Sequence, residues 1–316
     1  MAGILALWTA LWLTGCATPQ MSQLQQDFPV TASPPSLPVR AALDGVPFFP
    51  QDDYQCGPAA LAMLAQHAGV VVRPDELTAQ VFVPGRQGAF TVEMLAAARR
   101  QALLAYPLRP RLEDVLREVA SGNPVLVFQN LSLNVYPVWH YAVVIGFDRE
   151  RNTVTLHSGE TERLQMSMFT FERTWARGGH WAMVALKPDR LPATAQAESF
   201  MVAAAALERV QAAAAEVAYA TALQAWPGQR AALLGLGNAA YALGRKDEAA
   251  QRFLSAIQEH ANFADAWNNL AQVRLEQGRL QEAAEAIAQA VLAGGVRAET
   301  YRSLQMQVEQ QRLAGP

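Results

Sequence analysis

The sequence predicts an α+β domain followed by an all-α repeat domain. Between residues 56 and 120, apolar residues recur at helical spacing in several segments. Between residues 125 and 186, short runs of apolar and aromatic residues alternate with turn residues, a pattern typical of strands. From about residue 196 onward, alanine-rich sequence repeats with a period of 34 residues, which indicates stacked helix pairs. The chain of 316 residues is long enough for two domains with separate cores.

The chain begins with an apolar segment that ends at a cysteine. Residues 4–13 are too short to cross a bilayer, which takes about 20 residues, and they fit the core of a signal peptide. The following Leu13-Thr14-Gly15-Cys16 is typical of bacterial lipoproteins, so we expect removal of residues 1–15 and a lipid on Cys16. Ala17 differs from the Asp that retains lipoproteins in the inner membrane. The expected location is the cell envelope, at the outer membrane and facing the periplasm; the alternative is an ordinary signal peptide with Cys16 incidental.

A polar segment separates this cysteine from the first domain. Residues 17–45 are rich in Pro, Ser, Gln and Thr, which predicts that residues 16–45 are a flexible tether without packing of their own. We expect the first domain at residues 46–187. A short polar connector then leads to the repeat domain at residues 196–316.

The helices of the first domain are expected to precede its strands. Residues 56–67 form the first helix, because Pro58 suits a first helical turn and Gly69 suits a helix end. The remaining elements are helices at 91–102 and 112–120, strands at 125–128, 140–147, 153–157, 163–168 and 180–186, and a short helix at 169–175. This order predicts a helical half packed on an antiparallel sheet.

The repeats align with one another at corresponding apolar positions. Leu233, Trp267 and Tyr301 align, and Gly244 aligns with Gly278. Residues 215–227 fit the second half of an earlier, degenerate unit. The pattern resembles tetratricopeptide repeats, and this resemblance implies a surface that binds a protein partner.

Cys56 is the strongest candidate for a reactive residue. The chain has two cysteines, and a lipid on Cys16 would leave Cys56 without a disulfide partner. Cys56 stands where a helix is expected to begin, and a helix N-terminus together with an imidazolium lowers a thiol pKa. We therefore expect a reactive thiolate and a basic partner that is distant in sequence.

Five histidines are candidates for that base. His140 opens an apolar strand, where it can face a helix N-terminus, and it is our first choice. His180 opens the last strand and is the rival. His67 lies on the Cys56 helix, three turns away, His157 ends the following strand, and His260 lies in the repeats.

These motifs together resemble a known family. Gln51, Cys56-Gly57-Pro58-Ala59 and His140-Tyr141 with the following Val-Val-x-Gly pattern resemble the bacteriocin-processing, double-glycine leader peptidases of the papain-like clan. They are more similar still to stand-alone lipoprotein relatives with tetratricopeptide repeats. The resemblance implies a papain-like α+β fold, Cys56 as nucleophile and His140 as general base.

Two positions depart from the family pattern. The resemblance implies that a Gln before the Cys helps to form the oxyanion hole, and Gln51 stands five residues before Cys56 rather than six. We expect Gln51 to act with the Cys56 backbone N–H. The family also has an Asp that orients the His, and Ser158 occupies that position here. Ser158 can accept a hydrogen bond from His140 but supplies no negative charge, and Asp148 is better explained as a turn residue.

The favoured function is a membrane-anchored cysteine peptidase that hydrolyses peptide or amide bonds and needs no cofactor. Its expected partners are a peptide or protein substrate, a protein bound by the repeats, and the membrane through Cys16. The alternative is a catalytically impaired scaffold that binds peptides or proteins through the cleft and the repeats. Metal binding is a weaker hypothesis, because no Cys-x-x-Cys or His-x-x-x-His spacing occurs. A net charge of −3 and the lack of a basic run or phosphate-binding loop argue against nucleic-acid and nucleotide binding.

Overall fold

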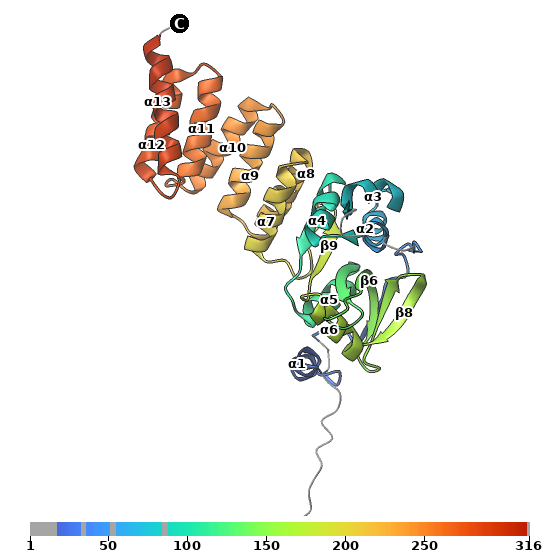
Figure 1. The fold of residues 1–316 in the computed structure, drawn as a ribbon. Coiled ribbons are helices and arrows are strands. Elements are labelled where there is room, and N and C mark those ends of the chain that lie inside the picture. The colour runs from blue at the N-terminus through green and yellow to red at the C-terminus, as the bar shows by residue number, and fades with distance from the viewer. Residues whose placement is uncertain (1–17, 33–35, 51–54, 84–87, 315–316) are drawn as a thin grey trace, which may run out of the picture.

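A computed structural model describes residues 18–32, 36–50, 55–83 and 88–314. The proposed lipidation residue Cys16 and the proposed oxyanion residue Gln51 lie outside these residues. The described part divides into an α+β domain and a helical region that extends from it as an arm (Figure 1).

The α+β domain is built on a seven-stranded antiparallel sheet. Its strand order is β4-β9-β5-β6-β7-β8, and β1 pairs with the far end of β6. The strands are β1 (Arg40–Ala42), β4 (Leu104–Pro107), β5 (Val125–Asn130), β6 (Trp139–Asp148), β7 (Thr153–Ser158), β8 (Thr161–Ser167) and β9 (Ala182–Leu186). A separate two-stranded pair consists of β2 (Phe82–Val83) and β3 (Gly88–Ala89).

Helices cover both faces of the sheet. One face packs against α2 (Cys56–His67), α3 (Pro74–Val81) and α4 (Thr91–Arg100). The other face packs against α5 (Leu112–Ala120) and α6 (Met168–Arg177). Because side chains alternate along a strand, β6 sends Tyr141 and Val143 into the first cluster and Ala142 and Val144 into the second. The predicted α+β class is confirmed, and so are the helices and strands expected in this domain, to within a few residues at their ends.

The expectation of an unpacked tether is wrong for the described part of residues 17–45. Helix α1 (Pro19–Asp27) packs on α5 and α6, and β1 joins the sheet. The buried carboxylate of Glu172 on α6 accepts hydrogen bonds from the Thr18 hydroxyl and from the backbone N–H groups of Gln20 and Met21. A carboxylate at a helix N-terminus satisfies free N–H groups and favours the helix dipole. The sequence of the segment does not reveal this cap, because Glu172 lies far along the chain.

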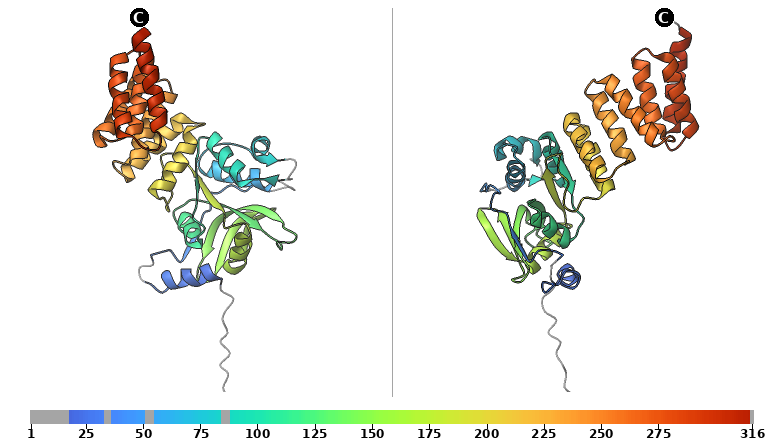
Figure 2. Two further views of the ribbon diagram at one scale, coloured as in Figure 1. Left: turned by 60° about the vertical axis from the view of Figure 1, so that its left-hand side comes forward. Right: turned by 180° about the vertical axis from the view of Figure 1, so that it is seen from behind.

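The C-terminal region consists of seven antiparallel helices. They are α7 (Ala197–Glu208), α8 (Ala212–Ala225), α9 (Arg230–Ala242), α10 (Lys246–Glu259), α11 (Ala264–Glu276), α12 (Leu280–Ala293) and α13 (Ala298–Ala314). Helices α9, α11 and α13 begin 34 residues apart, as the repeat requires. The arrangement is consistent with a tetratricopeptide-like all-α domain. Figure 2 shows the helix pairs stacked in a row away from the sheet. Helices α7 and α8 form a complete helix pair, whereas the sequence indicated only the second half of a repeat unit there.

The two regions share a continuous core. Phe200 and Leu207 of α7 belong to the same buried cluster as Leu104 and Leu186 of the sheet. The connector between the two regions is also held in place by the buried Glu118 carboxylate. This carboxylate accepts hydrogen bonds from the backbone N–H of Ala193, the backbone N–H of Thr194 and the Thr194 hydroxyl.

Candidate active site

Cys56 occupies the first position of α2. Gln55 is the N-cap residue, and its carbonyl accepts the first helical hydrogen bond from Ala59 at 3.1 Å. No side chain caps the helix, and Pro58 has no N–H. The backbone N–H groups of Cys56 and Gly57 are therefore the free donors of this helix end, and both donate toward the Cys56 sulfur.

The start of α2 packs closely on the start of β6. A Cβ atom added at Gly57 would lie 3.0 Å from the Ala89 Cβ, 3.3 Å from the Met94 Sδ and 3.6 Å from the Tyr141 Cδ2. The Tyr141 hydroxyl donates to the Ala89 carbonyl at 3.1 Å, which ties the strand to β3. The ladder between β6 and β7 begins at Val143, so the Tyr141 N–H lies beyond that ladder, and it acts on the Cys56 sulfur to lower the pKa of the thiol. The thiol thus lies beside the backbone that follows His140.

His140 lies near the start of β6, opposite Gln129 of β5. Its Nε2 atom is 2.9 Å from the Ser158 Oγ at the end of β7. Burial lowers the pKa of His140 to about 4, so the imidazole is neutral at pH 7. The position that the resemblance assigned to an orienting residue is therefore in contact with the histidine that it assigned as the base.

The pKa of the Cys56 thiol differs from our expectation. Burial raises the pKa of Cys56, although the backbone N–H groups of Tyr141, Gly57 and Cys56 itself act in the opposite direction. The expected lowering of this pKa is wrong for the structure. A neutral imidazole supplies no positive charge, and the desolvation of the thiolate outweighs the helix N-terminus. Both groups are therefore in their neutral forms at pH 7, and neither one contributes a charge to the other.

The other histidines have structural surroundings. His180, the rival, is half-buried and packs edge-on against Trp175 of α6 with a ring-centroid distance of 4.8 Å, and Trp175 belongs to the core on the opposite face of the sheet from Cys56. His157 is buried, with Nε2 3.2 Å from the Val46 carbonyl and Nδ1 accepting from the Arg163 N–H. The two remaining rings, of His67 and His260, lie within hydrogen-bond distance of the carbonyls of Gly122 and Gly228.

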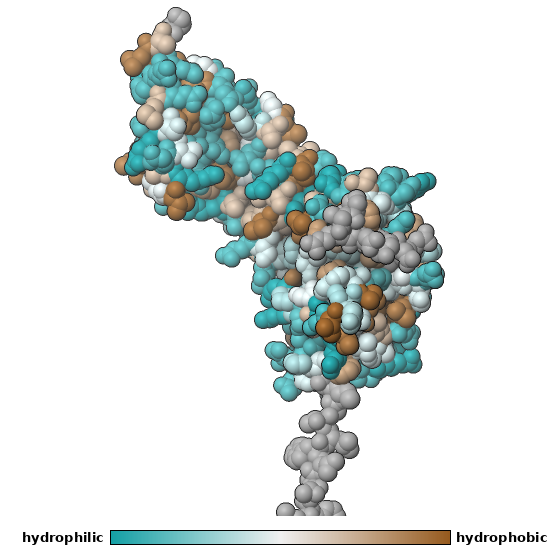
Figure 3. All heavy atoms as spheres, in the orientation of Figure 1, coloured by the Kyte–Doolittle hydropathy of each residue, from teal (hydrophilic) through white to brown (hydrophobic). Residues whose placement is uncertain are grey.

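An exposed apolar loop leads into His140. Between β5 and β6, Leu133, Val135 and Tyr136 are 66%, 77% and 81% exposed. Trp139, the neighbour of His140, is half exposed and stacks on Phe128 with a centroid distance of 5.2 Å. We did not single out this loop from the sequence, although its valines, tyrosine and tryptophan around Pro137 are a visible signal. Figure 3 shows that hydrophobic residues gather in small patches on an otherwise largely hydrophilic surface.

The described residues contain neither a candidate metal site nor a candidate membrane-spanning helix. Within these ranges no group of three or more His, Cys, Asp and Glu side chains is placed to hold a metal ion. Across the part of the chain that the structure describes, we also find no helix with the length and apolar character needed to span a membrane.

Comparison with known proteins identifies the domain that carries this site. Residues 43–183, which include Cys56, His140 and Ser158, match the model of the Peptidase_C39-like family. No curated protein matches the chain. Among solved structures, a Bacillus anthracis protein described as a C39-like peptidase is similar at 21% identity and a TM-score of 0.41, over 47% of this chain and 98% of the other. The peptidase domain of Streptococcus ComA, a bifunctional ABC transporter of a quorum-sensing pathway, is similar at 19% identity and a TM-score of 0.37, over 45% of this chain and 98% of the other. The match to the family model makes residues 43–183 a Peptidase_C39-like domain.

Proposed function

We propose that the domain is an active thiol peptidase in which Cys56 is the nucleophile and His140 is a neutral general base. The observation that carries this proposal is the meeting of the α2 start with the β6 start, where the Tyr141 N–H reaches the Cys56 sulfur and His140 contacts Ser158. Helix dipole, backbone donors and an adjacent imidazole are the components that thiol catalysis needs.

The protonation states support a general-base reaction. With the Nε2 proton of His140 donated to Ser158, the Nδ1 lone pair is the acceptor for the thiol proton. The sulfur attacks the carbonyl carbon of the substrate as its proton moves to His140, and the oxyanion forms near the Cys56 N–H. His140 then returns the proton to the leaving amine as the C–N bond breaks, and water hydrolyses the thioester. Gln51 is proposed as the second oxyanion donor.

Ser158 sets the strength of the base. An orienting carboxylate stabilises the imidazolium that forms during the reaction, whereas a hydroxyl only fixes the ring and its tautomer. The pKa of His140, at about 4, accords with this neutral partner. We therefore expect turnover to be slower than a carboxylate in the same position would allow.

The substrate is proposed to be a peptide with apolar side chains near the cleaved bond. The apolar loop runs directly into His140, and Trp139 provides an aromatic surface one residue from the base. An extended peptide lying along this loop would bury apolar area in contact with the reacting groups.

The location and partners are proposals as well. A lipid on Cys16 would tether the chain at an outer membrane facing the periplasm, and the segment that follows packs on the peptidase domain through α1. The helix pairs of α7 to α13 are proposed to bind a protein, either the substrate or an adaptor.

A peptide-binding scaffold is the second candidate. The raised pKa of Cys56 and the hydroxyl at position 158 favour it, since both weaken thiol catalysis. In this function the apolar loop would bind peptides without cleaving them.

A digest of a proteome-derived peptide library, read by mass spectrometry, tests the two candidates. We expect the full chain to cleave a subset of peptides, Cys56→Ala to abolish cleavage while its melting temperature stays unchanged, and His140→Ala to reduce it at least 100-fold. Cys16→Ala is the matched control, because it removes the other cysteine and should cleave normally. Peptides that are retained by the protein but not cut would establish the scaffold, and cleavage by Cys56→Ala would refute the assigned nucleophile.

A further inference from the structure

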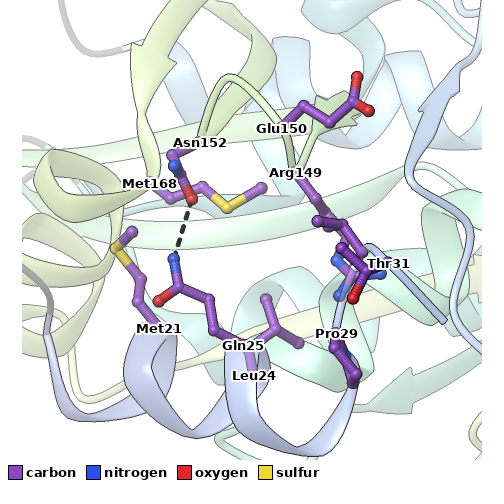
Figure 4. Close-up of a pocket in the computed structure, with 10 residues that line it drawn as sticks. Met21, Leu24, Gln25, Pro29, Thr31, Arg149, Glu150, Asn152 and Met168 are labelled. Carbon is purple, nitrogen blue, oxygen red and sulfur yellow. Dashed lines mark hydrogen bonds between the residues drawn. The ribbon is translucent and has the colours of Figure 1, made fainter.

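A cavity lies on the opposite side of the sheet from Cys56, between α1 and the loop that joins β6 to β7. Its volume is about 280 Å³. Met21 and Leu24 of α1 form one wall, and Arg149 and Met168 form part of the other (Figure 4). The exposed surface inside it is mainly apolar. The cavity exists only because α1 packs on the domain.

Arg149 presents an unpaired edge of its guanidinium group. The residue is 5% exposed, and its Nη1 donates to the Leu37 carbonyl at 2.8 Å. Its Nε and Nη2 are buried without a hydrogen-bond partner. These two nitrogens carry the parallel N–H bonds that bind both oxygens of one carboxylate. Arg109 shows the same edge with a carboxylate bound, because its Nε and Nη2 donate to the Asp114 carboxylate at 2.7 and 2.9 Å.

The acidic neighbours of Arg149 have other partners. Asp148 pairs with Arg151 at 3.8 Å, and Glu150 pairs with Arg40 at 2.8 Å. Figure 4 shows the Glu150 carboxylate pointing away from the Arg149 guanidinium. A buried charged donor pair without an acceptor is costly, and burial also lowers the pKa of Arg149. An external acceptor would remove this cost.

We propose that this cavity binds a small carboxylic acid with an apolar body, such as a medium-chain fatty acid. The carboxylate would accept hydrogen bonds from the Nε and Nη2 of Arg149, and the body would pack against Met21, Leu24 and Met168. The cavity volume lies just below the range of ligand sites, about 300–1,000 Å³, so a chain of medium length suits it better than a long one. Gln25 and Asn152, joined by a hydrogen bond of 3.3 Å, form a polar wall beside the apolar one.

Such a ligand would strengthen the attachment of α1. It would contact α1 through Met21 and Leu24 and the sheet domain through Arg149, so its binding free energy would add to that of the Glu172 cap. The segment nearest the proposed lipid anchor would then be held on the domain in a ligand-dependent way.

Calorimetric titration of the full chain carrying Cys16→Ser, which needs no detergent, tests the proposal. The probes are octanoate, octanol and inorganic phosphate. We expect octanoate to bind with a dissociation constant below 1 mM, octanol and phosphate to bind at least tenfold more weakly, and octanoate to raise the melting temperature.

Variants of Arg149 assign the site. Arg149→Lys keeps the charge but removes the parallel N–H pair, and we expect at least a tenfold loss of octanoate affinity; Arg149→Met should abolish the preference for octanoate over octanol. Arg151→Lys, on the adjacent exposed arginine, is the control and should bind normally. Equal binding of phosphate and octanoate would overturn the apolar part of the proposal. Absent octanoate binding, or binding unchanged in Arg149→Lys, would overturn the site itself; this comparison stands even if Arg149→Met fails to fold.

Discussion

Burial keeps both Cys56 and His140 in their neutral forms at pH 7. The pKa of the thiol is raised and that of the imidazole is lowered to about 4, in each case because desolvation disfavours the charged form. If the two residues act as the proposed catalytic pair, the proton transfers during the attack rather than before it. The reactivity of the free thiol and the pH dependence of the reaction should both reflect this difference.

The rate of Cys56 alkylation by iodoacetamide should therefore rise with pH without an acidic plateau. We expect a midpoint above the value of about 8.5 of a free cysteine, since the thiolate carries the reactivity and burial disfavours it. His140→Ala should leave this midpoint above 8.5, because it removes no positive charge. A plateau between pH 5 and 7 that disappears in His140→Ala would instead demonstrate an ion pair and contradict the neutral pair.

Substitutions at Ser158 should change the strength of the base in opposite directions. Ser158→Ala removes the partner of the His140 Nε2, so we expect kcat/KM to fall about tenfold or more. Ser158→Asp places a carboxylate there, which should raise both kcat/KM and the His140 pKa above about 4. The pKa is followed by NMR titration of the imidazole Cε1–H signal. A pKa that does not move in Ser158→Asp would show that the contact does not control the ring.

Close packing between elements places the thiol. Helix α2 reaches β6, β3 and α4 at Gly57, where an added Cβ would lie 3.0 Å from the Ala89 Cβ. A glycine at this position lets the helix start approach the Tyr141 backbone. The position of Cys56 therefore depends on its neighbour as much as on its own side chain.

Gly57→Ala should impair both folding and function. We expect the free energy of unfolding to fall by about 1–2 kcal/mol from overpacking, as measured by urea denaturation, and kcat/KM to fall at least tenfold from displacement of Cys56. Gly45→Ala is the control, because its added Cβ would meet no atom within 4 Å. If Gly57→Ala retains full activity, the helix start tolerates displacement and the packing argument fails.

At the scale of the whole molecule, the peptidase domain and the helical region are joined by a polar contact as well as by a shared core. Glu118 of α5 is fully buried and accepts hydrogen bonds from Asn123, Ala193 and Thr194. Helix α7 then packs on β4. The helical arm should therefore hold a fixed orientation relative to the sheet of the first domain.

Glu118→Ala should loosen this junction. Several buried donors would lose their acceptor, and we expect the free energy of unfolding to fall by about 3 kcal/mol. Urea denaturation followed by circular dichroism measures the loss. Glu113→Ala, on the same helix, breaks only a more exposed pair with Arg117 and should cost less than about 1 kcal/mol. Equal effects of the two variants would show that the connector is not held by Glu118.

Local patterns in the sequence indicated most of the helices and strands of the two domains and the family resemblance, but not α1 or β1. Pro58 and Gly69 delimit α2, the 34-residue period gives the helix pairs, and the motifs at Cys56 and His140 indicate the family that residues 43–183 match. These features depend on residues close in sequence, and periodicity and helix-end preferences are local properties.

The tertiary structure alone decided the electrostatics and the long-range contacts. The contact of Ser158 with His140, the burial that reverses the expected pKa of Cys56, the Glu172 cap of α1 and the unpaired edge of Arg149 all join residues far apart along the chain. The sequence determined which residues carry reactive groups. Only the fold decided which of them are desolvated and what faces them, because desolvation and hydrogen bonding depend on packing across the sheet and not on neighbours in sequence.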